Sequence, residues 1–252
     1  MIEKIIVDGR TIAVDVARPQ GATHNLLWLP GYLADMSGTK ASFLSQFCAQ
    51  KNLGIIRFDY SGVGLSAVGG QEFLQATLSD WLSEVLHIYK LYNDKPMILV
   101  GSSCGGWLAL LASLALQKIG QAPEALVLLA PAPDFTSILW RDKFTQQQQS
   151  ELVEQGVVYF GEEKVPFSQK FIDDAQQHHL LDGLIEINSP IYILQGQQDN
   201  VVPPEHSLAL LHRLVGCDVS LSLLKDGDHR LSGISDLQKL TQIIGDIVEE
   251  NG

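Results

Sequence analysis

The chain has 252 residues, of which 46% are hydrophobic and 18% charged, and 29 acidic against 17 basic residues give a formal charge of −12. This composition supplies enough apolar side chains for a sizeable core and excludes a disordered chain. The acidic balance opposes binding to nucleic-acid phosphates and to anionic membrane surfaces, and no apolar run reaches the roughly 18 residues that cross a bilayer.

The N-terminal segment predicts a β-hairpin, because the β-rich runs Ile5–Val7 and Thr11–Val16 flank the turn dipeptide Asp8-Gly9. After it, short apolar runs alternate with segments whose apolar residues have helical spacing. The runs predicted as strands are Leu26–Leu29, Gly54–Phe58, Met97–Val100, Ala125–Ala130, Ile191–Leu194 and Val219–Leu223. The segments predicted as helices are Ala41–Lys51, Leu78–Leu91, Trp107–Leu116, Pro204–Leu214 and Leu237–Glu249. This alternation predicts an α/β fold with a mostly parallel central sheet and helices on both faces.

The alternation breaks between Asp134 and about Ile187, where the chain is more polar and mostly helical in pattern. An insertion after the fourth parallel strand predicts a small helical cap at about 134–187, within a single domain that spans residues 1–252. Such a cap covers the carboxyl edge of the sheet, where open α/β sheets bind ligands. The apolar residues of the cap are expected either to line an apolar acyl pocket or to pack the cap against the core.

The strongest motif is Gly101-Ser102-Ser103-Cys104-Gly105, which matches G-x-S-x-G. It follows an apolar strand and opens an apolar helix, and this context is typical of a nucleophile elbow. A sharp strand-to-helix turn strains the middle residue, and glycine at Gly101 and Gly105 avoids collision with neighbouring backbone. The motif therefore predicts Ser103 as a nucleophile above the sheet edge, where the helix N-terminus favours developing negative charge.

A serine nucleophile needs a base for its proton and a carboxylate that orients the base. On such an elbow the chain order is serine, acid, histidine, which confines the search to residues after the strand at 191–194. Three of the seven histidines follow that strand, and His206 and His212 fall inside a predicted helix below the active edge. His229, directly after the last strand, is the predicted general base.

Asp199 is the predicted acid, because it is the one carboxylate in the loop Gln195–Pro203. A turn-capping role is the alternative for an aspartate in such a loop. Asp226 and Asp228 are too near His229 in sequence to reach its far ring nitrogen easily. Asp134, which follows the fourth strand, remains open as a displaced acid.

Acyl transfer to serine also needs backbone N–H groups aimed at the developing oxyanion. One predicted donor is the amide of Cys104, the residue after the nucleophile. The other is the amide of Tyr32, in the loop after the strand at 26–29, where Gly31 allows close approach of the backbone. The Tyr32 ring is expected either to line the acyl pocket or to pack in the core.

Two further motifs suggest function less strongly. The turn Arg57–Ser66 lacks the third glycine and the later acidic residue of a dinucleotide-binding fingerprint, so we expect a structural turn beside the site. The neighbouring His178 and His179 do not suit one metal ion, because adjacent helical residues point about 100° apart. We therefore expect neither a metal nor a cofactor. A contact between these two histidines and the substrate remains an alternative.

The three cysteines, Cys48, Cys104 and Cys217, lie far apart and show no C-x-x-C spacing. They are expected to be buried thiols in a reducing compartment. The N-terminus MIEKIIVDGR matches neither a signal nor a transit peptide. These features predict a cytoplasmic location.

Together these motifs resemble the α/β-hydrolase family, in particular a branch of animal mitochondrial enzymes that act on palmitoyl-protein thioesters and acyl glucuronides. The stretches that carry the resemblance are Pro30–Ala41, Arg57–Ser66, Ile98–Leu108, Gln195–Pro203 and Asp228–Arg230. The resemblance implies Ser103, Asp199 and His229 as the triad, and Pro-Gly-Tyr in place of the His-Gly of many esterases. The chain departs from the branch in starting without its transit peptide and in the cap, which mainly sets substrate preference.

The sequence thus predicts a serine hydrolase that cleaves an ester or thioester of an apolar acyl group through an acyl-Ser103 intermediate. A serine nucleophile argues against dehalogenases and epoxide hydrolases, which use a carboxylate at that position. A lipase or a C–C bond hydrolase on the same triad remains open, as does a non-catalytic ligand-binding module on the same scaffold. The expected partner is a small-molecule or acylated substrate, with no nucleic acid and no membrane span, and the oligomeric state stays open.

Overall fold

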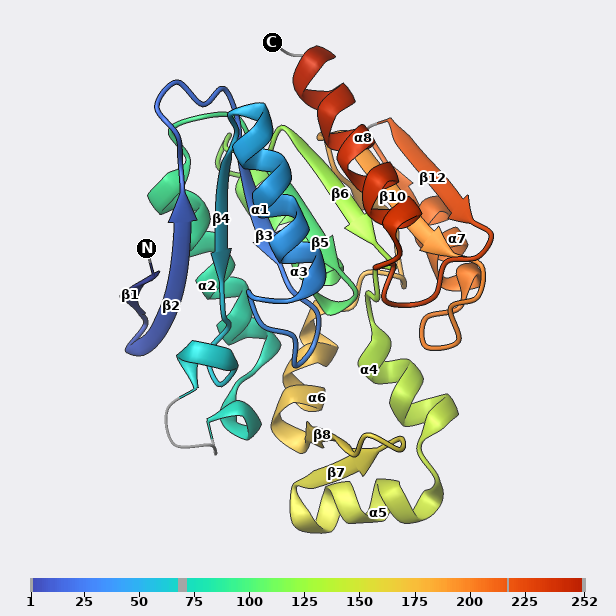
Figure 1. Cartoon of the computed structure of the whole chain (residues 1–252). Helices are drawn as coiled ribbons and strands as arrows, with labels where there is room; N and C mark the ends of the chain where they lie inside the picture. Colours follow the sequence, from blue (N-terminus) through green and yellow to red (C-terminus); the bar gives the residue numbers. More distant parts are fainter. Residues whose placement is uncertain (1, 68–71, 217, 251–252) are drawn as a thin grey trace.

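The computed structural model of the protein describes residues 2–67, 72–216 and 218–250, and its centre is an eight-stranded sheet (Figure 1). The strands follow the order β1-β2-β4-β3-β5-β6-β10-β12. Their bounds are β1 Ile2–Val7, β2 Arg10–Ala17, β3 Asn25–Leu29, β4 Gly54–Phe58, β5 Met97–Ser102, β6 Ala125–Leu129, β10 Ile191–Gly196 and β12 Val219–Leu224. The predicted hairpin forms β1 and β2, and all strands from β4 to β12 in the sheet order run parallel. The predicted fold class is therefore confirmed.

Helices cover both faces of the sheet (Figure 1). Helices α1 (Thr39–Lys51) and α8 (Ile234–Glu250) cover one face, and α2 (Leu78–Tyr92), α3 (Cys104–Gln117) and α7 (Pro204–Arg213) cover the other. Because side chains alternate along a strand, Leu26 packs in the α1–α8 core and its neighbour Leu27 in the α2–α3 core. Strands buried on both faces need continuous apolar runs, which explains why these runs were recognisable in the sequence.

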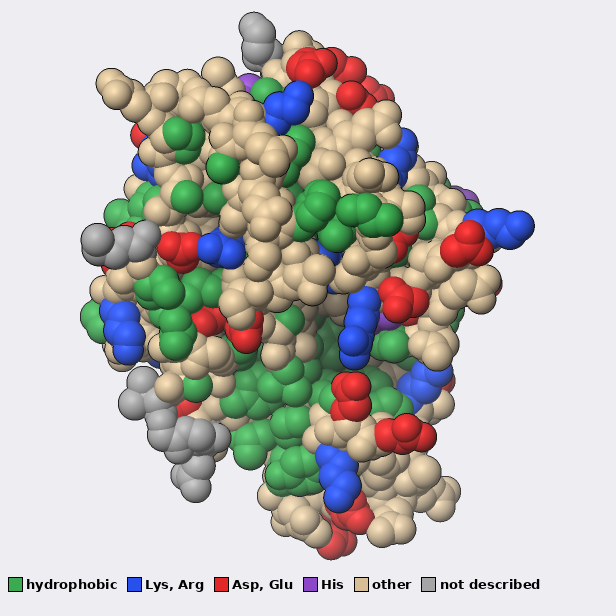
Figure 2. Space-filling model, in the orientation of Figure 1, with side chains coloured by type: hydrophobic (Ala, Val, Ile, Leu, Met, Phe, Trp, Pro, Cys, Tyr) green, Lys and Arg blue, Asp and Glu red, His purple; other side chains and the backbone are tan. Residues whose placement is uncertain are grey.

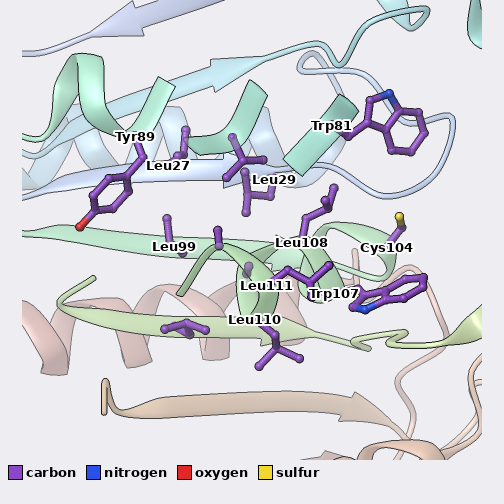
Figure 3. Close-up of a cluster of buried hydrophobic side chains, with 14 of the residues drawn as sticks. Leu27, Leu29, Trp81, Tyr89, Leu99, Cys104, Trp107, Leu108, Leu110 and Leu111 are labelled. Carbon is purple, nitrogen blue, oxygen red and sulfur yellow. The ribbon is translucent and has the colours of Figure 1, made fainter. Parts of the chain in front are cut away.

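The α2–α3 side of the core is the larger one, and Figure 3 shows part of it. Helix α2 begins at a capping box in which Thr77 Oγ1 accepts from the Asp80 amide and Asp80 Oδ2 accepts from the Thr77 amide, both at 3.0 Å. Its buried residues recur every three or four positions, which points Trp81 at the sheet. Trp81 and Trp107 are fully buried and flank the beginning of α3, so the helix that carries the elbow is held firmly.

An insertion between β6 and β10 forms the cap below the carboxyl edge of the sheet (Figure 1). Its elements are α4 Phe135–Ile138, a π-helical turn Leu139–Lys143, α5 Gln146–Gln155, β7 Val157–Phe160, β8 Val165–Ser168, α6 Gln169–Ala175, a 3-10 turn Gln176–His178 and β9 Ile185–Glu186. Strand β9 pairs with β11 (Leu214–Val215) outside the main sheet.

The prediction that the cap is helical was wrong for residues 157–168. These residues form an antiparallel pair of strands, β7 and β8. Val157–Phe160 is a run of β-branched and aromatic residues, and Gly161 follows it with a φ of 73°. Such a run that ends at a left-handed glycine favours a hairpin over a helix.

The two ends of the cap are joined at its base. Asp134, where the chain leaves the sheet, accepts hydrogen bonds from the amides of Leu180 and Leu181, at 2.9 and 2.8 Å. Trp107 Nε1 on α3 donates to the His178 carbonyl oxygen at 3.1 Å. The cap is therefore fixed to the body where it starts and where it returns.

Candidate active site

Ser103 occupies the sharp turn between β5 and α3, with φ 54° and ψ −117°. A non-glycine residue in this region is strained and persists only where its surroundings hold it. The two flanking glycines have no room for a side chain: a Cβ on Gly101 would lie 2.4 Å from the Gly105 carbonyl oxygen, and one on Gly105 would lie 2.1 Å from the Leu29 carbonyl oxygen. The turn thus has the conformation expected of a nucleophile elbow.

The strand register brings the three predicted triad residues to one edge of the sheet. Ser102, Leu129, Leu194 and Ser222 form a row across β5, β6, β10 and β12. Ser103 follows this row directly, and Asp199 and His229 lie in the loops after β10 and β12. Parallel strands end at a common edge, so these loops are neighbours.

Asp199 and His229 form a hydrogen bond of 2.8 Å between Asp199 Oδ2 and His229 Nδ1. The Asp199 side chain is fully buried, while 23% of the His229 side chain is exposed. Burial alone would raise the pKa of Asp199, but the bond and charge of His229, together with the Val202 and Val201 amides, hold it below its usual value. Asp199 is therefore ionised and can orient the imidazole and stabilise its protonated form.

The loops that carry these two residues are held against each other. A Cβ on Gly196 would lie 2.3 Å from the Gly227 carbonyl oxygen, and the Gln198 amide donates to that oxygen at 2.9 Å. Asp199 Oδ2 also accepts from Gln195 Nε2 at 3.1 Å. This close backbone contact fixes the separation of acid and base.

The other carboxylates considered for the acid have partners or positions of their own. Asp228 Oδ1 accepts from the Arg230 and Leu231 amides, each at 3.0 Å, and so caps the loop beyond His229. Asp134 joins the two ends of the cap, and Asp226 is exposed. The geometry favours Asp199.

The two amides predicted to bind an oxyanion belong to segments that touch at the elbow. A Cβ on Gly31 would lie 3.3 Å from the Ser102 carbonyl oxygen and 3.5 Å from Ser103 Cβ, which brings the loop of Tyr32 against Ser103. Within the described parts of the chain, neither the Tyr32 nor the Cys104 amide has a hydrogen-bond acceptor. Two unpaired N–H groups beside a strained serine can stabilise a tetrahedral oxyanion.

Sequence reasoning missed one basic residue at this edge. Lys40 Nζ, at the start of α1, donates to the carbonyl oxygen of Arg230, next to His229. Burial lowers the pKa of Lys40 to about 8, and the nearby Arg230 acts in the same direction, against Asp228 and Asp236. No short-range signal could have revealed this contact, because it joins residues 190 positions apart.

Hydrophobic side chains gather in a hollow between the body and the cap (Figure 2). Residues of the cap cluster that remain partly exposed include Phe135, Leu139, Phe160 and Val165, together with Tyr32 from the body. Four exposed apolar residues follow strands of the main sheet at the same edge, in connecting segments or, for Ile234, at the first residue of α8: Leu33 (41% exposed), Leu65 (52%), Val201 (60%) and Ile234 (65%). An apolar surface of this kind suits an acyl chain better than a charged group.

Two histidines of the cap are bonded to serine hydroxyls of neighbouring helices. His178 Nε2 lies 2.7 Å from Ser79 Oγ on α2, and His179 Nε2 lies 2.7 Å from Ser137 Oγ on α4. His206 and His212 both lie on α7, and burial lowers the pKa of His206. In the described residues, no group of three or more His, Cys, Asp or Glu side chains is close enough to hold a metal ion.

The turn Arg57–Ser66 has the structural role that we expected. Asp59 accepts from the Met36 and Leu65 amides, both at 2.7 Å, and a Cβ on Gly64 would lie 2.3 Å from Asp59 Oδ2. Cys48 and Cys104 are buried free thiols, and burial raises the pKa of both, whereas Cys217 lies outside the described residues. Over the same described ranges, no helix is long and apolar enough to cross a membrane.

Comparison with known proteins gives one family match and several close relatives. The model of the family described as "Uncharacterised protein family (UPF0227)" matches residues 26–245. Human mitochondrial palmitoyl-protein thioesterase ABHD10 is 37% identical over 239 residues, which cover 92% of this chain and 75% of the relative. The mouse protein of the same name is 35% identical over 243 residues, which cover 92% of this chain and 78% of the relative.

Solved structures show the same relationship. A putative hydrolase from Agrobacterium vitis S4 superposes with a TM-score of 0.92 at 36% identity, over 98% of both chains. Mouse alpha/beta hydrolase domain-containing protein 10 gives a TM-score of 0.88 at 30% identity, over 100% of both chains. Est1E from Butyrivibrio proteoclasticus, with ferulic acid bound, gives 0.79 at 19% identity, a likeness that shows the shared fold alone. The resemblance drawn from the sequence motifs is confirmed.

Proposed function

Because the chain belongs to the UPF0227 family and has the α/β-hydrolase fold of its ABHD10 relatives, we propose that it is a serine hydrolase of acyl esters and thioesters. Ser103 is the nucleophile, His229 the general base and Asp199 the orienting acid. The Tyr32 and Cys104 amides form the oxyanion hole. No step in this scheme uses a metal or a cofactor.

Acylation begins when Ser103 Oγ attacks the substrate carbonyl carbon and His229 Nε2 accepts the serine proton. The bond of Asp199 to Nδ1 keeps the ring in the tautomer whose Nε2 can accept this proton, and its charge stabilises the imidazolium. The carbonyl electron pair moves to oxygen and is held by the two amides. When the tetrahedral intermediate collapses, His229 returns the proton to the departing alcohol or thiol, and the acyl group stays on Ser103.

Deacylation repeats these steps with water as the nucleophile. His229 removes a proton from water, the hydroxide adds to the acyl carbon, and the second tetrahedral intermediate expels Ser103 Oγ. His229 then returns its proton to the serine, which releases the carboxylic acid and restores the enzyme.

One observation carries the proposal: strained Ser103 sits at the same sheet edge as His229, whose Nδ1 is bonded to the buried carboxylate of Asp199. A structural turn needs neither this backbone strain nor a buried acid–imidazole pair. Strain of this kind concentrates at functional sites because the surrounding fold must maintain it. The arrangement therefore supports nucleophilic catalysis rather than a purely structural elbow.

The apolar hollow beside the site supports a substrate with an apolar acyl group (Figure 2). The relatives at 33–37% identity are named palmitoyl-protein thioesterases, and we propose a long-chain acyl thioester as the substrate class of this chain too. Their names also place them in mitochondria. The cytoplasmic location expected from the sequence remains a prediction.

The test is labelling by a fluorophosphonate, read by intact mass, on the wild type, Ser103→Ala and Ser113→Ala. Ser113 is a matched control, because it lies on the same helix, is fully buried and has no partner for its Oγ among the described residues. We expect one label on the wild type and on Ser113→Ala, and none on Ser103→Ala. Equal labelling of Ser103→Ala, or none on the wild type, rejects the proposal and favours a ligand-binding module.

The same three proteins are then assayed with p-nitrophenyl esters from acetate to palmitate and with an acyl thioester. We expect kcat/KM to rise with chain length beyond acetate, because each buried methylene contributes about 0.8 kcal/mol. A profile that is flat or highest at acetate rejects the apolar acyl pocket while leaving the nucleophile in place. Activity on emulsified triglycerides alone indicates a lipase.

A further inference from the structure

We propose that the cap sets the position of one oxyanion donor through the side chain of Tyr32, which acts as a positioning residue. The inference deepens the proposed function and depends on it. The backbone of Tyr32 follows Gly31, which touches the elbow at Ser102 and Ser103, whereas its side chain contacts the cap. One residue therefore connects the catalytic loop with the element that sets substrate preference.

The hydroxyl of Tyr32 is bonded to the cap hairpin. Tyr32 Oη donates to the carbonyl oxygen of Pro166 on β8 at 2.8 Å. The next residue of the hairpin, Phe167, stacks on the Tyr32 ring with centroids 4.9 Å apart and an interplanar angle of 14°. Burial raises the pKa of the Tyr32 hydroxyl, so it keeps its proton and remains a donor at any working pH. Both contacts hold the ring to the same two-residue segment of the cap.

Aromatic rings from both sides complete the surroundings of Tyr32. Phe135 and Phe171 of the cap lie 5.9 and 5.2 Å from the Tyr32 ring centroid. Phe73 and Trp81 of the body lie at 5.2 and 5.8 Å. These ring pairs contribute beyond their buried area, by about 0.5–1.5 kcal/mol each. The Tyr32 ring is thus the point at which cap and body pack together beside Ser103.

The loop that carries the amide is held at two places: at Met36, whose amide donates to Asp59 Oδ1 at 2.7 Å, and at Tyr32, through this side chain. The Ala34 amide donates to the Gly31 carbonyl oxygen at 3.0 Å and closes a tight turn. Leu33 in that turn has a φ of 61°, a conformation that a branched apolar residue adopts only under constraint. Because the turn is strained, an external anchor is needed to keep the Tyr32 amide aimed at the oxyanion.

The test compares Tyr32→Phe with Tyr89→Phe. Tyr89 is a matched control, because it is also buried and its hydroxyl donates to a backbone carbonyl, that of Gln121, at 3.1 Å. Gln121 follows α3 at the opposite edge of the sheet, so the two variants lose the same kind of bond at different places. A third variant, Phe167→Leu, removes the stacking partner from the cap side.

We expect Tyr32→Phe and Phe167→Leu to lower kcat for a p-nitrophenyl ester by about tenfold, with KM changed less than about twofold, because a misplaced oxyanion donor acts on the transition state. Inhibition by an alkylboronic acid, which forms a tetrahedral adduct with a nucleophilic serine, should weaken by a similar factor. Tyr89→Phe should keep wild-type kcat and inhibition, while its Tm falls as much as that of Tyr32→Phe.

Three outcomes overturn the inference. If Tyr32→Phe keeps wild-type kcat, the cap does not position the donor. If its KM rises at unchanged kcat, Tyr32 lines the substrate pocket instead. If Tyr89→Phe loses kcat equally, the effect is one of global stability. All three presuppose that the fluorophosphonate labels wild-type Ser103, and a wild type without label refutes the proposed function itself.

Discussion

Asp199 Oδ2 lies 2.8 Å from His229 Nδ1, a contact between two loops that follow neighbouring parallel strands. An imidazole whose Nδ1 is bonded in this way directs Nε2 away from the carboxylate, because the two ring nitrogens lie on opposite sides of the ring. The carboxylate is fixed in turn by the Val201 and Val202 amides, at 2.9 and 2.8 Å. These contacts hold the Asp199 carboxylate in place against His229 Nδ1.

Asp199→Asn should lower kcat by about 10³- to 10⁴-fold with little change in KM, because the amide favours the wrong imidazole tautomer. Asp134→Asn should leave kcat near the wild-type value but reduce the free energy of unfolding by about 1–2 kcal/mol, since Asp134 holds the cap base. Steady-state kinetics and urea unfolding of both variants check this. An active Asp199→Asn with an inactive Asp134→Asn reverses the assignment.

Stability should depend on pH through Asp199, whose pKa is held below its usual value by His229 and the Val202 and Val201 amides, although burial raises it. A carboxyl with a depressed folded-state pKa contributes stability above its unfolded value of about 3.9, and this stability is lost as the pH falls through the folded-state pKa. The wild type should therefore be more stable than Asp199→Asn near neutral pH, with a difference that shrinks on acidification below about pH 4. Urea unfolding at several pH values measures it, and a constant difference contradicts it.

The backbone strain at Ser103 predicts that relieving it raises the stability of the protein. Five of the eight non-glycine residues with positive φ in the described ranges lie at or just after strand ends on this edge: Leu33, Ser103, Ala130, Asp134 and Leu231. Glycine tolerates the conformation of Ser103, whereas alanine keeps the strain. Ser103→Gly should therefore exceed Ser103→Ala in free energy of unfolding by about 1 kcal/mol, although both are inactive. A Ser103→Ala variant that is equally stable or more stable argues against strain.

Two helical glycines should respond in opposite directions to alanine. A Cβ on Gly105 would lie 2.1 Å from the Leu29 carbonyl oxygen, so Gly105→Ala must displace β3 or the elbow. We expect the free energy of unfolding to fall by about 3 kcal/mol or more, and fluorophosphonate labelling to be lost. A Cβ on Gly245 of α8 meets nothing within 4 Å, so Gly245→Ala should gain about 0.5–1 kcal/mol and keep full labelling. Thermal unfolding of both variants measures the two changes in stability.

The sequence revealed those parts of the fold that depend on local pattern. The parallel strands are buried on both faces and must be apolar throughout, so Met97–Val100 and Ala125–Ala130 were visible as strands. Chain order and strand ends were enough to select Asp199 and His229, which the structure brings into contact. The Gly101 and Gly105 pattern worked because close backbone contacts leave no alternative to glycine there.

Features that depend on long-range contacts were not visible in the sequence. Tyr32 Oη and Pro166 are 134 residues apart, and Lys40 and Arg230 are 190 apart. The role of Asp134 at the cap base also emerged only from the structure, because the amides that it binds follow the insertion. The cap hairpin was missed for a different reason, since a short β-rich run within a polar helical stretch gives conflicting periodicities.

The bonds between Asp134 and the Leu180 and Leu181 amides have a consequence for how the insertion can vary. It closes the insertion at its neck, while β6 and β10 on either side pair directly with each other in the sheet. A segment closed in this way can be lengthened, shortened or exchanged as a unit without shifting β5 and β10, the strands that precede Ser103 and Asp199. Under the proposed function, a change in this one segment would alter the acyl group that is accepted and leave the residues proposed for hydrolysis in place.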